Sequence, residues 1–292
     1  MKKLVLLTFS LISCGAFAQL TAQNLANAAK DTRYLALGDS LAFGLNPFIQ
    51  PPNLSKYIGY PDFVSQTLHE TLANASCPGE TSGTFDGTSS TYYPGYDCTP
   101  LRKSGLFVPY NGAANQLQYA VNYLKTNPNV KLVTINIGVN DLGILQADCT
   151  EQNAGNPIAI AACETAQLPG VLGTYATNLE IIFSALRGTG YTGPIVFLNA
   201  SAFNYADPLQ VGAITALNQV VSTVNLAGGF NITIADAYHA FALVAAPFGG
   251  DVCKTGLLLK NPDGSCDTHP TTAGQALLGA TVVSALASSA VK

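Results

Sequence analysis

The stretch Ala36-Leu37-Gly38-Asp39-Ser40-Leu41-Ala42-Phe43-Gly44 decides how the fold of this chain is interpreted. The short apolar run Tyr34-Leu35-Ala36-Leu37 predicts a buried strand, which Gly38 ends, and Ser40 follows at once. Because open α/β sheets bind ligands at the carboxyl ends of their strands, Ser40 is a candidate nucleophile. The alternative is that Ser40 is a turn residue or a helix cap, as most serines after strands are.

Outward from this turn, strand-like and helix-like segments alternate along the chain. We expect further strands at 130–137, 195–198 and 232–235. We expect helices at 111–125, 173–187, 208–226 and 272–286. Residues 145–170 are expected to be a loop closed by a disulfide. This alternation predicts a parallel sheet with helices on both faces, in one domain.

The composition describes a globular protein. Of its 292 residues 48% are hydrophobic and only 10% are charged, which predicts a sizeable core. The formal net charge is −4, and no basic stripe exists to meet phosphates, so we expect no nucleic-acid partner. We expect a monomer.

The first residues have the pattern of an export signal. Lys2 and Lys3 precede the apolar run from Leu4 to Ile12, and Ala16-Phe17-Ala18 is a cleavage site before Gln19. We therefore expect a signal peptide at 1–18, a single mature domain at 19–292, and a secreted or periplasmic protein. An open alternative is that Leu11-Ile12-Ser13-Cys14 is a lipoprotein signal with a lipidated Cys14. No other stretch is long and apolar enough to predict a membrane span.

Cysteine usage fits export. Of seven cysteines, all but Cys14 lie beyond the signal, and they fall into local couples within loops rich in small and polar residues. An even number in an exported chain predicts disulfides. A zinc site is the alternative, but no Cys-x-x-Cys motif or grouped His accompanies these residues, so we expect no metal. The expected pairs are Cys77–Cys98, Cys149–Cys163 and Cys253–Cys266.

Four candidate site residues lie at turns or loops between the expected elements. Ser40 would attack a carbonyl carbon, and His269 would take its proton and later give it to the leaving alcohol. The Gly79 and Ser40 N–H groups and the Asn140 amide would hold the oxyanion. Such loops can converge on one edge of a doubly wound sheet.

These segments resemble the four sequence blocks of the SGNH hydrolases, also called the GDSL esterase/lipase family. The matching segments are Gly38-Asp39-Ser40-Leu41, Asn74 to Gly79, Gly138-x-Asn140-Asp141 and Asp267-x-His269-Pro270. The resemblance implies a flavodoxin-like three-layer α/β/α sandwich with a central, mostly parallel five-stranded sheet. It also implies a serine esterase mechanism with no metal and no organic cofactor.

One spacing departs from the family pattern. The family's last block usually places Asp three residues before His, whereas Asp267 lies two before His269. Either Asp267, the main-chain carbonyl of Cys266, or neither orients His269. We favour Asp267, because a carboxylate gives the stronger, charge-assisted hydrogen bond. Asp39 is expected to brace the turn, Asp141 to be structural, and His239 to be a surface or packing histidine.

Two functions from different classes follow. The first is a secreted serine esterase acting on lipid, short-chain acyl or acetylated-carbohydrate esters, and tyrosines and phenylalanines near 43–60 and 92–110 could line its substrate site. The second is a non-catalytic binding or surface protein that has kept the fold. The complete set of Ser40, Gly79, Asn140 and His269 favours the enzyme, since a binding protein does not need all four.

Overall fold

The computed structural model describes residues 34–49, 56–94 and 113–289. Within these residues one sheet of five strands has the order β2-β1-β3-β4-β5, and every neighbouring pair is parallel. The strands are β1 (Tyr34–Gly38), β2 (Leu72–Asn74), β3 (Leu132–Asn136), β4 (Ile195–Leu198) and β5 (Ile232–Ala235). The predicted α/β class and parallel sheet are therefore confirmed.

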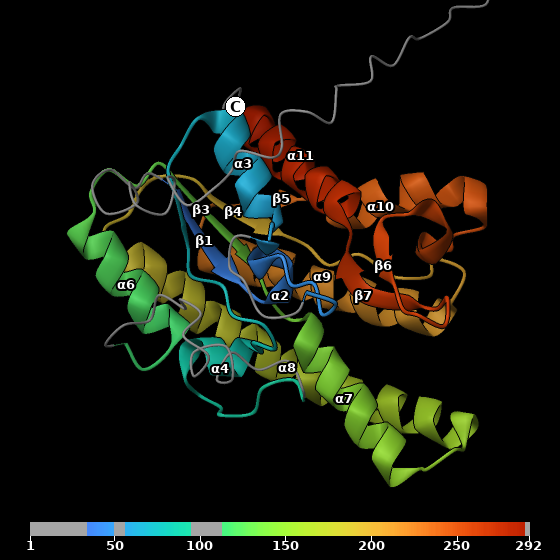
Figure 1. Ribbon diagram of the computed structural model, residues 1–292. Helices are drawn as coiled ribbons and strands as arrows, with labels where there is room; N and C mark the ends of the chain where they lie inside the picture. The colour runs from blue at the N-terminus through green and yellow to red at the C-terminus, as the bar shows by residue number, and fades with distance from the viewer. Residues whose placement is uncertain (1–33, 50–55, 95–112, 290–292) are drawn as a thin grey trace, which may run out of the picture.

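Helices cover both faces of the sheet, which makes three layers (Figure 1). Leu35 and Leu37 point into one core, whereas Tyr34 and Ala36 point into the other, as the two-residue period of a strand requires. The first core is closed by α6 (Gln116–Thr126), α8 (Pro157–Gly188) and α9 (Pro208–Gly228). The second is closed by α3 (Tyr60–Leu68), α10 (Ala237–Ala245) and α11 (Thr272–Ser289).

Burial on both faces explains why β1 and β3 are mostly apolar. All five residues of β1 and of β3 are buried, as expected for parallel strands between two helical layers. Thr134 and Asn136 are the polar residues within β3. The Thr134 Oγ1 lies 2.7 Å from the hydroxyl oxygen of Tyr34 and 3.3 Å from that of Tyr60, so these three buried hydroxyls have partners.

The prediction of a loop over 145–170 was wrong. This region is helical: α7 (Val139–Gln152) is followed after four residues by α8, and the two helices pack together. Asn156 caps α8 by accepting a hydrogen bond from the Ala159 N–H at 3.2 Å, and Pro157 occupies a first-turn position that suits proline. Pro169 lies inside α8 without ending it, which the sequence pattern did not anticipate.

The segment around His269 is a strand rather than a loop. β7 (Cys266–Pro270) pairs antiparallel with β6 (Leu258–Lys260), and this hairpin lies beside the main sheet (Figure 1). A short helix, η4 (Val252–Thr255), precedes it. The remaining short helices are α2 (Ser40–Phe43), α4 (Ser82–Asp86) and η3 (Ala246–Phe248).

Disulfides join Cys149 to Cys163 and Cys253 to Cys266. The first links α7 to α8, and the second links η4 to the start of β7. Cys77 is also disulfide-bonded, but its expected partner Cys98 lies outside the described residues, as does the expected signal with Cys14. In the ranges that the structure describes, no helix is both long and apolar enough to cross a membrane.

Peptide mapping under non-reducing conditions should recover three local disulfides and no free thiol in the mature protein. The expected pairs are the two above and Cys77–Cys98, because short loops between cysteines are the least costly to close. Mass spectrometry of the digest before and after reduction identifies each pair. Crossed pairings would contradict the prediction.

Candidate active site

The strand order creates a crevice between β1 and β3. The chain moves from β1 to the neighbouring edge strand β2, and from β3 it continues to β4 on the other side. In sheets of this order, the carboxyl ends of the two central strands diverge into loops that bind ligands. Ser40 lies two residues after the end of β1, and Asn140 lies in the first turn of α7, which begins three residues after the end of β3.

The turn after β1 depends on Gly38. Its φ is +138°, and a Cβ at this position would lie 2.3 Å from the carbonyl oxygen of Asn136. Only glycine tolerates both conditions. The Gln116 side chain of α6 also holds this turn. Its Oε1 accepts from the Gly38 N–H at 2.6 Å, and its Nε2 donates to the Gly38 carbonyl at 2.9 Å.

Asp39 braces the same turn, in agreement with the sequence prediction. Its Oδ1 accepts hydrogen bonds from the Leu41 N–H at 2.9 Å and from the Asn136 Nδ2 at 2.6 Å. The carboxyl is only 2% exposed. Burial raises its pKa to about 6, although both hydrogen bonds and the charge of His269 act in the opposite direction.

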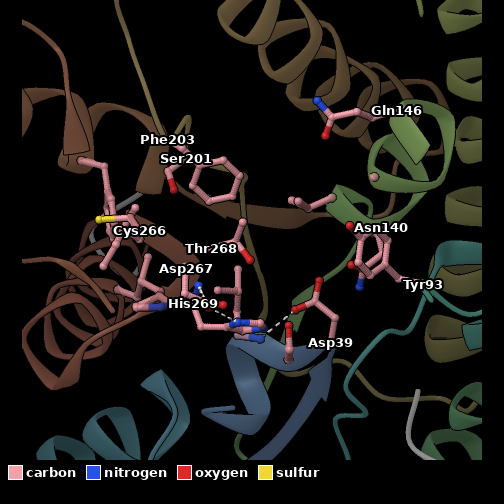
Figure 2. Close-up of a pocket in the computed structure, with 18 of the residues that line it drawn as sticks. Asp39, Tyr93, Asn140, Gln146, Ser201, Phe203, Cys266, Asp267, Thr268 and His269 are labelled. Carbon is pink, nitrogen blue, oxygen red and sulfur yellow. Dashed lines mark hydrogen bonds and ion pairs between the residues drawn. The ribbon is translucent and has the colours of Figure 1, made fainter. Parts of the chain in front are cut away.

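A cavity of about 270 Å³ opens at this point. Ser40, Asn140, Asp267 and His269 all line it, whereas Gly79 does not. Figure 2 shows His269 and Asp267 on one side of the cavity and Asn140 on the other. The remaining lining residues are Asp39, Leu41, Tyr93, Val139, Gly143, Gln146, Ser201, Phe203, Phe241, Leu258, Asn261, Cys266, Thr268, Pro270 and Leu278.

His269 and Asp267 form a nearly buried pair, with side chains 6% and 11% exposed. One carboxylate oxygen, Oδ1, lies 2.5 Å from the imidazole Nδ1 and also accepts from the His269 backbone N–H at 2.8 Å. Partial burial would raise the pKa of the carboxyl, but the hydrogen bonds from His269 outweigh burial and hold the pKa below its usual value. Because Asp267 holds Nδ1, Nε2 is the imidazole nitrogen that would exchange a proton with a ligand.

The loop that carries Gly79 is attached to the helix that carries Asn140. The Asn140 Nδ2 donates to the Glu80 carbonyl at 2.8 Å, so Asn140 lies next to the Gly79 segment. Asp141 also holds this loop at Ser82, because its two carboxylate oxygens accept from the Ser82 N–H at 2.9 Å and from the Ser82 hydroxyl at 2.5 Å. The Asn140 amide has a second N–H that can donate to a ligand.

A second Asp–His pair has the three-residue spacing that is usual in the family that the sequence resembles. Asp236 caps α10 and lies 2.5 Å from the Nδ1 of His239, three residues later. The two side chains are 48% and 73% exposed, and neither lines the cavity. The sequence-based choice of His269 over His239 therefore agrees with where the cavity lies.

Sequence reasoning missed much of the cavity wall. Gly143 and Gln146 line it, although they lie in or next to the segment interpreted as a loop. Tyr93 also lines it and belongs to the segment near 92–110 whose aromatic residues the sequence analysis expected at a substrate site. The helical spacing of Asn140, Gly143 and Gln146 was the available signal. Among the described residues, no group of three or more His, Cys, Asp or Glu side chains could hold a metal ion.

Comparisons with known proteins bear on the family and the fold. The sequence model of the GDSL-like Lipase/Acylhydrolase family matches residues 36–277. No curated protein matches the sequence.

Several solved structures share the fold. An extracellular lipase from Streptomyces rimosus has a TM-score of 0.56 at 20% identity, over 87% of this chain and 99% of that chain. A phospholipase A1 from Streptomyces albidoflavus has a TM-score of 0.56 at 18% identity, over 88% and 99%. A carbohydrate esterase family 2 enzyme with a carbohydrate binding domain, from Corynascus thermopiles, has a TM-score of 0.52 at 16% identity, over 88% and 66%.

The Asp39→Asn variant should have a flatter dependence of stability on pH than the wild-type protein. Because folding raises the pKa of Asp39 to about 6, the folded state binds this proton more tightly than the unfolded state. Asp39 therefore lowers the free energy of unfolding as the pH rises from about 4 to about 6, by at most about 1.4 kcal/mol per pH unit. Asparagine has no such titration.

Urea unfolding of both proteins at about pH 4.5 and about pH 7 measures the difference. The wild-type protein should lose more unfolding free energy than Asp39→Asn between these two conditions. An equal loss in both proteins would show that Asp39 ionises normally in the fold.

Proposed function

The chain belongs to the GDSL-like Lipase/Acylhydrolase family, and we propose that it is an exported serine esterase that forms an acyl-enzyme on Ser40. One observation carries this proposal. A single cavity is lined by a serine at the end of the first strand, an amide donor after the third strand, and a histidine paired with a carboxylate. These are the nucleophile, the oxyanion donor and the base that ester hydrolysis needs.

In the first half-reaction, the Ser40 Oγ attacks the ester carbonyl carbon while the His269 Nε2 takes the hydroxyl proton. The carbonyl oxygen becomes an oxyanion, which the Asn140 Nδ2 and the Ser40 and Gly79 N–H groups stabilise. The tetrahedral intermediate then collapses. The bond to the alcohol oxygen breaks, His269 gives its proton to that oxygen, and the acyl group stays on Ser40.

In the second half-reaction, water replaces the alcohol. The water oxygen attacks the acyl carbon while the His269 Nε2 takes a proton from this water. Collapse of the second tetrahedral intermediate breaks the bond to Ser40, returns the proton to the Ser40 oxygen and releases the carboxylic acid. Each cycle consumes one ester and one water.

Asp267 is the residue that we assign to orient His269. Its Oδ1 accepts from both the backbone N–H and the ring Nδ1 of His269, which supports this role despite the short spacing. An aspartate that bonds the N–H two residues later forms a tight local turn, and this turn brings the carboxylate to the ring. The negative charge then stabilises the imidazolium that forms during catalysis.

The substrate is a small-molecule, lipid or glycan ester. The cavity has both apolar lining residues, such as Phe203 and Leu258, and polar ones, such as Gln146 and Asn261. Apolar walls with few polar groups are usual for sites that bind small organic ligands. This lining supports an ester with an apolar acyl part and a polar alcohol part.

We also propose export, with residues 1–18 as the signal and 19–292 as one mature domain. The basic start and the Ala16-Phe17-Ala18 site support this assignment. The disulfides Cys149–Cys163 and Cys253–Cys266 also support it, because disulfides persist mainly in oxidising compartments. Intact mass distinguishes a chain that begins at Gln19 from one that begins at a lipidated Cys14.

Replacing Ser40 by alanine should remove ester hydrolysis without unfolding the protein. Loss of a serine nucleophile lowers kcat by a factor on the order of 10⁶. A chromogenic short-chain ester measures turnover, and thermal unfolding checks the fold. Ser222→Ala, at an exposed position on α9, is the matched control and should keep wild-type activity.

Retention of wild-type activity by Ser40→Ala would show that another residue is the nucleophile. A wild-type protein that hydrolyses no ester would instead support a non-catalytic binding protein with this fold.

Replacing Asp267 by asparagine should lower kcat by about 10⁴, because the neutral amide neither holds the required tautomer nor stabilises the imidazolium. Asp236→Asn changes the exposed Asp–His pair in the same way and should leave kcat unchanged. Steady-state kinetics on one ester compares the two variants. An Asp267→Asn enzyme within about tenfold of wild type would leave a Ser40–His269 dyad, with the imidazole oriented by another group.

A further inference from the structure

The ring of Tyr93 forms the cavity wall beside Asn140 (Figure 2). Two contacts fix its position. The Tyr93 backbone N–H donates to the Gly79 carbonyl at 2.8 Å, so the residue is attached to the proposed oxyanion loop. The ring lies against Gly143 of α7, where a Cβ would be 2.7 Å from the ring Cε2 and 2.9 Å from Cδ2.

These distances mean that the ring occupies the space of a side chain at position 143. Cβ atoms do not approach other carbons this closely, so any larger residue at 143 would push the ring away from α7. Gly143 follows Asn140 by three residues and shares its helix face. The ring therefore lies about one helical turn from the proposed oxyanion donor, and both the ring and Gly143 line the cavity.

Glycine is otherwise an unfavourable choice inside a helix, by roughly 1 kcal/mol relative to alanine. Some helical glycines of this chain, such as Gly274 and Gly279 of α11, also have a neighbour that a Cβ would meet, and others have none. A Cβ at Gly212 of α9 or at Gly173 of α8 would meet nothing within 4 Å. At position 143 the steric reason for glycine is the Tyr93 ring.

The reaction geometry determines which part of an ester meets this ring. The leaving alcohol must lie near His269, which protonates it, and the carbonyl oxygen must lie near Asn140. Tyr93 is on the Asn140 side, across the cavity from His269 (Figure 2). The group beside Tyr93 is therefore the acyl chain rather than the alcohol.

We propose that the Tyr93 ring, seated on Gly143, sets the length of the acyl group that the enzyme accepts. This inference rests on the proposed esterase function. The cavity has a volume of about 270 Å³, and Tyr93 forms part of its wall, so a change at this ring changes the space available to the acyl chain. Without the ring the wall beside Asn140 recedes and longer chains fit.

The test compares kcat/KM for p-nitrophenyl octanoate and p-nitrophenyl acetate, two esters with the same leaving group. The octanoate-to-acetate ratio reports the acyl side alone, and it does not depend on what fraction of a variant is active. Tyr93→Ala should raise this ratio about tenfold or more, since even one methylene changes selectivity by that order. Gly143→Ala should lower it, because the displaced ring narrows the cavity.

Three further variants separate the ring from other causes. Tyr93→Phe keeps the ring and should keep the wild-type ratio. Gly212→Ala adds the same methyl group to a helix where nothing lies within 4 Å and should also keep it. In the Tyr93→Ala background, Gly143→Ala should no longer change the ratio, because the ring that it displaces is absent.

An active enzyme whose ratio is unchanged by Tyr93→Ala would overturn this inference and leave the esterase proposal intact. So would a Gly143→Ala effect that persists in the Tyr93→Ala background. A wild-type protein that hydrolyses neither ester would overturn the esterase proposal, and this inference with it.

Discussion

The close approach of the first and third strands at Gly38 is the constraint on which the site depends. Gly38, the last residue of β1, has a φ of +138° and lies against the Asn136 backbone. The chain therefore turns within one residue. Asp39 is thereby buried and bonded to the Asn136 amide. Ser40 then begins α2, whose Leu41 carbonyl accepts a hydrogen bond from the Gln275 Nε2 of α11 at 3.2 Å. The turn is held from both helical layers of the sandwich.

The cavity is built from segments far apart in the sequence. β1 brings Ser40, α7 brings Asn140, and the β6–β7 hairpin brings Asp267 and His269. The hairpin is tied to η4 by the Cys253–Cys266 disulfide, one residue before Asp267. Rigid support of this kind matters, because a preorganised site holds developing charge without reorganising during the reaction.

The sequence predicted the elements whose patterns are local. The strands at 195–198 and 232–235 have the predicted bounds, since both are short apolar runs between polar turns. Ser40, Asn140 and His269 could be chosen because each follows or lies in a strand and has the required chemistry. The choice of Asp267 stayed open, because spacing alone does not show that one carboxylate oxygen can reach both the N–H and the ring of His269. The contact of Tyr93 with Gly143 joins residues distant in the chain and leaves no local signal.

Covalent labelling with a serine-directed fluorophosphonate tests the central claim most directly, because it reports the activated nucleophile itself. After labelling, the protein is digested and the modified peptide is identified by mass spectrometry. The account predicts one adduct per chain, on Ser40, and slow or absent labelling when His269 is replaced by alanine. An adduct on a different serine, or ester hydrolysis by a protein that takes up no adduct, would contradict it.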